Sequence, residues 1–587
     1  TMKPRFMLNS FGCALMVIAI LGGLPALASP VHADASDKGR RNVLFITCDQ
    51  RLFQPVRAKG FRQPALDRLA ARGVTFTNHY IASAVCTPSR GVIYSGRAPQ
   101  VTGIQEEMMF GWTPSLPTNA VSMGTAMKRL GYATAYFGKF ELDRDIVYPK
   151  PGVNYADALK KYGFDVWQPY GEVTGEQNQG YEVDGVIGAE GIRWLRTNAE
   201  RLRKAGEPWF LVLSFINPHD IFFADVNPPG TSVQKGLKPG LIAAIPADAQ
   251  YRKQWDFPMW STLDEPLRAP GRPGAHWEFY RGTANVMGEV PTDRRDMWRA
   301  YDNFYLNLLR ENDRCMGQVL DALDDLDLWK DTVVVFTSDH GELAGVHGGL
   351  RNKGPVSYEQ NVHVPMIVVH PDVKGGQTTR ALTSHIDVLP TLVGLTGAPR
   401  EEADDITKGL PGRDFSTVLA NPSSVRPDAV RPGILFNYVG LSTVDARFFT
   451  SIFEAGFGKD GKFAMRPAEL AGNHPDLDKR GFVAMTFDGR YKFARYYAPS
   501  QFNRPRTLEE ILAWNDLELF DLEGDPEERN NLALDPKRNE ALILRMNALL
   551  NELMAREVGV NDGRFLPPAV RPKGSVCCEG APNASPK

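Results

Sequence analysis

The residues Cys86-Thr87-Pro88-Ser89-Arg90 place a thiol, two hydroxyls and a guanidinium group together, and Ser95-Gly96-Arg97 follows shortly after. Pro88 and Ser89 favour a turn that opens a short helix. The Cys86 thiol would then lie near the positive end of a helix dipole, where a nucleophile or an anion is favoured. This stretch therefore predicts a reactive or anion-binding site at residue 86.

Polar side chains also follow two apolar runs that are typical of buried parallel strands. Asn42 to Thr47 is followed by Cys48-Asp49-Gln50, and Thr332 to Thr337 is followed by Ser338-Asp339-His340-Gly341-Glu342. Open α/β sheets bind their ligands at the carboxyl ends of such strands. For Asp49 alone, the capping of a loop is an equally good interpretation, and the partners on the second run favour a binding site.

Asp49, Gln50, Asp339 and His340 can converge on one cation from these two strand ends. Three oxygen donors and one imidazole suit a hard divalent ion such as calcium, magnesium or manganese. The same donor set argues against a structural zinc site. We therefore predict a divalent metal site and keep the identity of the metal open.

Two further strand ends carry basic side chains. Tyr132 to Phe137 is followed by Gly138-Lys139-Phe140-Glu141, and Trp209 to Ile216 is followed by Asn217-Pro218-His219. A lysine at such a place is more often a solvated charge, and a lone histidine is more often structural. For His219, the position at the end of a buried strand on the same sheet edge favours a role in the site, whereas the local pattern alone does not single out Lys139.

The pattern Cys-x-Pro-Ser-Arg with Ser-Gly-Arg closely following resembles the motif of the formylglycine-dependent sulfatases, which belong to the alkaline phosphatase-like superfamily. In that family the cysteine is oxidised after translation to an aldehyde, and here that residue would be Cys86. The resemblance covers Asn42 to about Val560, with separated motifs in the family order. It implies a need for formylglycine-generating machinery during maturation.

The same resemblance implies roles for the residues already singled out. Modified Cys86 would bind the metal together with the four strand-end residues, and calcium is the first choice for the ion. Gln50 stands where the family usually has aspartate, and His340 stands where it often has asparagine. The residues implied to act on the nucleophile, the sulfate or the leaving group are Cys86, Arg90, Lys139, His219 and Lys353.

The resemblance leaves the roles of two further positions open. Glu141 stands where the family pattern Gly-Lys-x-His has histidine, which leaves open the residue that removes the proton from the aldehyde hydrate. His347 precedes Arg351-Asn352-Lys353-Gly354, the loop that resembles the one carrying a second sulfate-binding lysine. Glu141 and His347 are therefore assigned only to substrate binding.

The implied reaction is hydrolysis of a sulfate ester to an alcohol or phenol and inorganic sulfate. The substrate would be a small-molecule or carbohydrate sulfate ester, and the sequence does not distinguish aryl, alkyl, choline and carbohydrate esters. One alternative is a formylglycine-dependent phosphonate monoester or phosphodiester hydrolase, because the same positive site tolerates a phosphoryl group. Another is a catalytically inactive protein that binds sulfated glycans.

Alternating strand and helix patterns up to residue 400 predict an α/β catalytic domain at residues 41–400, with a large mixed, mostly parallel sheet flanked by helices. Residues 222–296 are rich in Pro, Gly and aromatic residues and show no sustained period. Their aromatic side chains either pack or form a wall over the active-site mouth, with packing favoured for most. Those side chains are Trp255, Phe257, Trp260, Trp277 and Tyr280.

The alternation stops at residue 401. Thr486 to Tyr497 predicts a hairpin with Asp488-Gly489 at the turn, and Leu517 to Leu522 predicts a further strand. Leucines and a methionine between residues 542 and 553 form an amphipathic helix that must cover that sheet. We therefore predict a smaller C-terminal α+β subdomain at 401–567, an antiparallel sheet plus helix, and a disordered tail at 568–587.

The composition and the N-terminus indicate which partners and which cellular location to expect. The 67 basic and 69 acidic residues nearly balance, which argues against nucleic acid as a partner. Lys3 and Arg5, the apolar run Phe11 to Leu24 and small residues after it predict a signal peptide at 1–33, and an uncleaved anchor is the alternative. We expect a secreted or periplasmic protein with no stable membrane insertion after cleavage. The pairing of Cys577 and Cys578 stays open.

Overall fold

The computed structural model describes residues 39–571, apart from 151, 153, 154, 156, 169–176 and 457–472. The predicted signal peptide, Cys577, Cys578 and residues 572–587 of the predicted tail lie outside the described residues. Pro568–Val570 forms a short 3₁₀ helix (η7) in which Val570 is buried, so this beginning of the predicted tail is ordered.

An eight-stranded sheet with the order β11-β2-β10-β9-β1-β6-β4-β5 forms the centre of the larger unit. The neighbours from β9 through β1, β6 and β4 to β5 are parallel, whereas β10 is antiparallel to β9 and β2. The predicted mixed, mostly parallel sheet is therefore confirmed. Its strands are β1 (Asn42–Cys48), β2 (Val74–Phe76), β4 (Ala133–Gly138), β5 (Val166–Gln168), β6 (Trp209–Ser214), β9 (Thr332–Ser338), β10 (Met366–Val369) and β11 (Gln377–Thr379).

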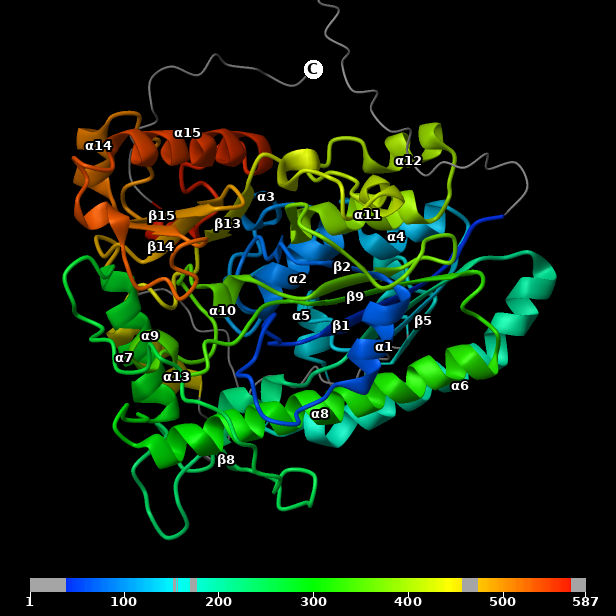
Figure 1. The fold of residues 1–587 in the computed structure, drawn as a ribbon, viewed down its shortest axis with the longest axis horizontal. Helices are drawn as coiled ribbons and strands as arrows, with labels where there is room; N and C mark the ends of the chain where they lie inside the picture. The colour runs from blue at the N-terminus through cyan, green and yellow to red at the C-terminus, as the bar shows by residue number, and fades with distance from the viewer. Residues whose placement is uncertain are drawn as a thin grey trace, which may run out of the picture.

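The alternation of side chains along β1 supplies two cores, one on each face of the sheet. Val43 and Phe45 pack with one set of helices, and Leu44 and Ile46 pack with the other. Figure 1 shows the long helices α6 and α8 along one face. The first set is α2 (Cys86–Ser95), α4 (Met123–Arg129), α11 (Val388–Leu395) and α12 (Arg400–Thr407), and the second is α1 (Pro64–Arg72), α6 (Gln179–Ala205) and α8 (Arg295–Asp325).

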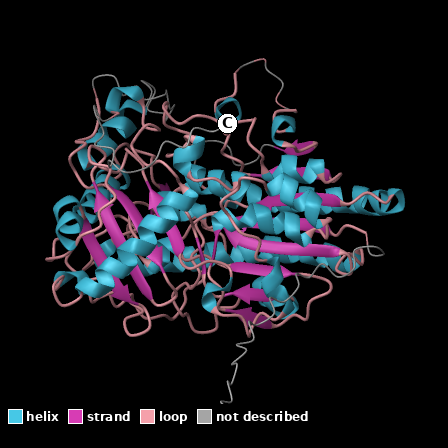
Figure 2. Ribbon diagram, turned by 90° about the horizontal axis from the view of Figure 1, so that it is seen from above, coloured by secondary structure: helices cyan, strands magenta, loops and turns pink. Residues whose placement is uncertain are grey.

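A four-stranded antiparallel sheet with the order β13-β14-β15-β16 forms the smaller unit, as predicted, and Figure 2 shows it beside the larger sheet. One face packs on α15 (Glu540–Glu557) through residues such as Phe493 and Leu519. The other face packs on the larger unit, where Phe436 and Tyr496 join a core with Tyr80. The strands are β13 (Ile434–Tyr438), β14 (Phe482–Phe487), β15 (Tyr491–Tyr497) and β16 (Asp516–Asp521).

The boundary between the two units lies later than predicted. Ile406, Phe415 and Leu419 belong to the core of the larger unit. Residues from 401 to about 430 therefore continue the larger unit, and the smaller sheet begins with β13.

The long insertion contains a helix that the sequence pattern did not predict, α7 (Gly274–Met287). It packs against α13 (Ala446–Gly456), which comes from the C-terminal part of the chain. Packing is confirmed for the five aromatic residues that the sequence singled out, since they join cores around α8 and around residues 343–358. None of those five is among the described residues that line the cavity beside Cys86.

Candidate active site

Cys86 is the first residue of α2 and is buried at the edge of a cavity. Its Sγ atom lies 3.6 Å from Asp49 Oδ1 and 3.3 Å from His340 Nε2. The preceding residue, Val85, has a φ of 59°, a left-handed conformation that is strained for a β-branched side chain. Burial, and then the charges of Asp49 and Glu107, raise the pKa of the Cys86 thiol well above its usual value. The unmodified thiol is thus a poor nucleophile at neutral pH.

The ends of β1 and β9 bring the predicted metal ligands together. The two strands pair in parallel, with Cys48 opposite Ser338, so that Asp49 and Asp339 leave the sheet side by side. The ligand atoms of the cluster all lie within 4.8 Å of one another, and every side chain in it is buried. The members of this cluster are Asp49, Cys86, Asp339 and His340.

The electrostatics of the cluster fit a cation. Burial and the neighbouring Asp49 carboxylate raise the pKa of Asp339. Although burial alone would raise it, Lys139 and other positive groups hold the pKa of Asp49 well below its usual value. A divalent ion between the two carboxylates would relieve their repulsion, and carboxylate oxygens with one imidazole are donors that such an ion accepts.

Gln50 lies next to this cluster, but its side chain has other partners. Its backbone N–H donates to Asp339 Oδ1 (3.1 Å), whereas its side-chain amide donates to Glu342 and accepts from Lys353 Nζ (2.5 Å). The role of Gln50 as a metal ligand stays a prediction. In this structure the amide links the cluster of predicted metal ligands to the loop that carries Lys353.

Glu342 is a site residue that the sequence reasoning missed. Its side chain is fully buried, and it accepts hydrogen bonds from Tyr301, from the backbone N–H groups of Ala344 and Asn352, and from Gln50. It therefore fixes the start of the loop that leads to Lys353. The sequence did contain a signal for this residue, because Glu342 stands in the polar run directly after β9.

Arg90 lies behind the carboxylates and does not line the cavity in the described residues. Its guanidinium donates to Asp339 Oδ2 (3.0 Å), Asp49 Oδ2 (3.1 Å), Ser214 Oγ (2.9 Å) and the carbonyl of Lys139 (2.8 Å). Both carboxylates are thus oriented by one buried, rigid fork of donors. In this geometry Arg90 positions the aspartates.

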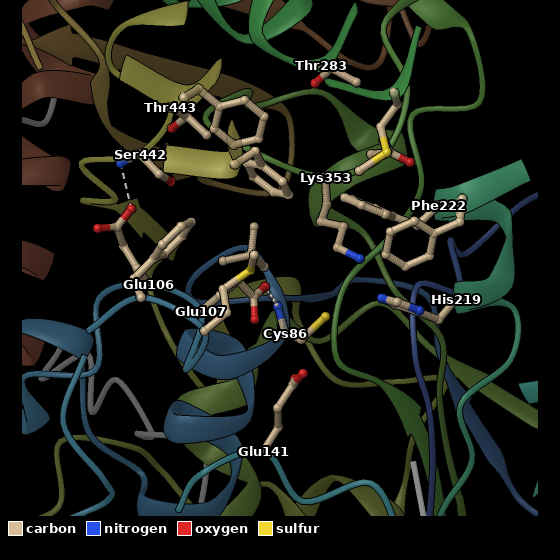
Figure 3. Close-up of a pocket in the computed structure, with 18 of the residues that line it drawn as sticks. Cys86, Glu106, Glu107, Glu141, His219, Phe222, Thr283, Lys353, Ser442 and Thr443 are labelled. Atoms are coloured by element: carbon tan, nitrogen blue, oxygen red, sulfur yellow. Dashed lines mark hydrogen bonds between the residues drawn. The ribbon is translucent and has the colours of Figure 1, made fainter. Parts of the chain in front are cut away.

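Lys139, His219, Lys353 and Glu141 reach the cavity beside Cys86, as Figure 3 shows for the last three. Lys139 Nζ lies 2.8 Å from Asp49 Oδ2 and 3.3 Å from Glu141 Oε2. Burial and the positive charges of Lys353 and Lys139 hold the pKa of His219 well below its usual value, so its ring is neutral at neutral pH. The structure therefore brings these four predicted residues to one place.

Glu141 forms a second acidic group at residue 86. The Cys86 thiol and the carboxylates of Glu107 and Glu141 lie within 4.8 Å of one another. Glu107 accepts hydrogen bonds from the backbone N–H of Cys86 (2.9 Å) and from the hydroxyl of Thr87 (3.0 Å). Burial, with Glu107 adding to it, raises the pKa of Glu141 to about 8. The sequence pointed to Glu141 and gave no signal for Glu107.

His347 is not brought to the cavity, and its predicted role in substrate binding gains no support from its position. Its Nδ1 atom lies 2.9 Å from Glu265 Oε2, and its ring stacks on Tyr358 with centroids 3.6 Å apart. Tyr358 in turn donates to Glu518 in β16 (3.0 Å). This contact ties the loop between His347 and Tyr358, which carries Lys353, to the smaller sheet.

Comparison with known proteins agrees with this geometry. Residues 41–398 match the family model described as Sulfatase. An ulvan-active sulfatase of Formosa agariphila is 25% identical over 532 residues, which cover 88% of this chain and 81% of the relative. No helix in the described ranges is both long and apolar enough to cross a membrane.

Solved structures share the fold across nearly the whole chain. A 2-O GAG sulfatase has a TM-score of 0.57 at 20% identity and covers 91% of this chain and 98% of its own. A phosphonate monoester hydrolase from Silicibacter pomeroyi has a TM-score of 0.59 at 20% identity, with 89% and 97% covered. Since the family model spans more than half of the 587 residues, the chain belongs to the sulfatase family of the alkaline phosphatase-like superfamily.

Proposed function

We propose that this protein hydrolyses a sulfate ester to an alcohol or phenol and inorganic sulfate, with residue 86 as the nucleophile after its conversion to formylglycine. One observation carries the proposal. The residue-86 side chain lies within hydrogen-bonding reach of a buried Asp/His cluster, and two lysines and a histidine face the same cavity.

A sulfate ester is already anionic, so its attack needs charge neutralisation, a strong nucleophile and a proton for the departing oxygen. A divalent cation (calcium by preference, magnesium or manganese as alternatives) held by Asp49, Asp339 and His340, and the hydrate of formylglycine, would supply the first two of these. The buried thiol of Cys86 provides neither charge neutralisation nor a strong nucleophile, so it is not sufficient by itself.

The chain's own residues supply binding and proton transfer. Lys139 and Lys353 would hold the sulfate oxygens, and a donor of this kind contributes roughly 3 kcal/mol to transition-state stabilisation. His219 would donate the proton to the leaving oxygen. The two lysines disfavour its charged form, and a bound sulfate anion between them would offset that effect and allow the ring to hold the proton.

The context of the protein is part of the same proposal. Formylglycine at residue 86 requires modifying machinery in the host. The basic, apolar and small-residue pattern at the N-terminus supports export to the periplasm or the medium.

Mass spectrometry of the peptide that bears Cys86, from protein made in its native host, tests the nucleophile. We expect the mass of an aldehyde or its hydrate, and turnover that is lost in Cys86→Ala. An unmodified thiol in protein that is nevertheless active would contradict the proposal.

The second candidate is hydrolysis of a phosphonate monoester or phosphodiester, because a phosphonate monoester hydrolase shares the fold at a TM-score of 0.59. Values of kcat/KM on an aryl sulfate, an aryl phosphonate and an aryl phosphodiester with the same leaving group distinguish the two. We expect the sulfate to be preferred, and a higher efficiency on either phosphorus ester would favour the second candidate.

A further inference from the structure

The cavity beside Cys86 continues into a region lined by phenylalanine rings, which we call the aromatic wall. Figure 3 labels one of these rings, that of Phe222, close to Lys353 and His219. The rings come from the segment after α2, from η2 (His219–Phe223), from α7 and from α13. The wall consists of Phe110, Phe222, Phe223, Phe279, Phe449 and Phe453.

Phe222 places this wall directly beside the groups that would meet the leaving oxygen. Its ring stacks on that of His219, with centroids 5.8 Å apart and planes 7° from parallel. The ammonium of Lys353 lies 4.7 Å from the centroid of the same ring. The first atoms of the alcohol part beyond a sulfate would therefore meet an aromatic face.

Two glycines hold the rest of the wall in place. A Cβ atom on Gly354 would lie 2.5 Å from the ring of Phe279, so the residue after Lys353 packs directly against that ring. A Cβ atom on Gly282 would lie 3.0 Å from Phe449, which lets α13 approach α7 closely. Phe449 also packs on Phe453, with centroids 4.9 Å apart. The wall is thus a pre-formed surface.

The charges of the cavity disfavour an alcohol part that carries further anionic groups. Among the described residues that line it, the basic side chains are Lys139, Lys353 and His219. The two lysines are already assigned to the sulfate, and His219 is assigned to the leaving oxygen. The carboxyl groups that line the cavity belong to glutamates, which in either protonation state offer no cation to a second sulfate or carboxylate. These residues are Glu106, Glu107 and Glu141.

Two of the polar groups beside the wall are paired within the protein. Thr443 Oγ1 donates to the hydroxyl of Tyr438 (3.1 Å), and the backbone N–H of Ser442 donates to Glu106 Oε1 (2.6 Å). Rings stacked around a few internally paired polar groups are typical of a site for an aromatic ligand.

We infer that the cavity selects sulfate esters whose alcohol part is an uncharged aromatic group, and that Phe222 and Phe449 determine this selectivity. The inference rests on the proposed sulfatase function and narrows its substrate class.

Two primary alkyl sulfates with leaving groups of similar basicity test the inference, 2-phenylethyl sulfate and glucose 6-sulfate. We expect kcat/KM to be at least about tenfold higher for the phenylethyl ester, which is the gain expected for one aromatic contact of about 1.4 kcal/mol. A preference for glucose 6-sulfate, or for the cationic ester choline sulfate, would overturn the inference and leave the sulfatase function standing. Failure to turn over even 4-nitrophenyl sulfate would overturn both.

Phe449→Ala gives the selective test, because this side chain is only half-buried and its loss leaves the catalytic residues unchanged. We expect roughly tenfold lower kcat/KM for 2-phenylethyl sulfate and a change within about twofold for glucose 6-sulfate. Phe53→Ala removes another half-buried ring, which stacks on His363 and does not line this cavity, and should change neither value.

Gly282→Ala tests the wall without removing a ring, since its new methyl group would lie too close to the ring of Phe449 and would push that ring away from α7. It should reproduce the selective loss on 2-phenylethyl sulfate. Equal losses on both esters in Phe449→Ala and in Gly282→Ala would contradict the assignment of selectivity to this wall.

Discussion

Two regions beside Cys86 are built by different parts of the chain: the aromatic wall, and the buried polar cluster around Asp49, Asp339 and Lys139, which we call the floor. At the floor, Asp49 and Asp339 extend from neighbouring strands of one sheet, and Arg90 fixes both with buried hydrogen bonds. At the aromatic wall, Phe279 comes from the long insertion and Phe449 from the C-terminal part of the chain. The floor depends on charge and hydrogen bonding, and the wall depends on packing.

This difference indicates which property each end can change. Under the proposed function, a change at the floor alters the binding of the sulfate group, which every substrate would share, so it should affect all esters alike. A change at the wall alters only the contact with the alcohol part, so it should affect some esters and spare others. The following predictions test this division of the cavity.

The largest effect is expected at the floor, from Asp339→Ala. Removal of this carboxylate deletes a predicted metal ligand and leaves the Arg90 guanidinium without one of its buried partners. We expect kcat to fall by more than roughly a thousandfold on aryl and alkyl sulfates alike, with loss of the bound cation. Rates on both ester types and elemental analysis of the purified protein measure this.

The exposed Asp325 at the end of α8 provides the matched control. Asp325→Ala should retain both the metal content and the rates. A loss in Asp339→Ala that spared one ester type would break the division, because the floor would then contribute to selectivity.

An intermediate effect is expected from His219→Ala, at the border between floor and wall. The proton that this ring would donate matters most for a poor leaving group. We expect a loss of roughly a hundredfold on an alkyl sulfate and only about a few-fold on 4-nitrophenyl sulfate. A plot of log kcat against leaving-group pKa should steepen in the variant, and equal losses on all esters would remove His219 from the acid role.

The floor could be predicted from the sequence because it depends on local signals. The apolar runs that form β1, β4, β6 and β9 are followed by polar residues of the site, so Asp49, Lys139, His219 and Asp339 could be placed on one sheet edge without knowledge of their contacts. The orientation of Gln50 could not be predicted, because its amide partners, Glu342 and Lys353, are more than 290 residues away in the chain.

The wall could not be predicted because no local pattern encodes it. Phe279 lies in a helix within a segment that shows no period, and Phe449 lies in a helix that packs on it only in the folded chain. The close approach of these helices depends on Gly282, and a lone glycine has many explanations in a sequence. The aromatic residues that did attract attention, such as Trp255, pack elsewhere.

The smallest effect is expected from Glu141→Gln and depends on pH. Since burial raises the pKa of Glu141 to about 8, its carboxyl is neutral below that pH and ionised above it. Lys139 keeps its charge, because Asp49 raises the pKa of the lysine although burial opposes this. The ionised Glu141, 3.3 Å from Lys139 Nζ, would then compete with the sulfate for this ammonium.

The KM of the unmutated protein should therefore rise by about three- to fivefold between pH 7 and pH 9, which corresponds to a well-screened interaction of about 1 kcal/mol or less between the two charges. In Glu141→Gln the neutral amide cannot ionise, so KM should stay nearly constant over this range while kcat changes little. Both esters should respond equally, because the competition concerns only the sulfate. A KM that rises with pH in the variant as steeply as in the unmutated protein would show that the ionisation of Glu141 does not weaken sulfate binding at Lys139. A rise confined to the aromatic ester would instead place the effect of Glu141 at the wall.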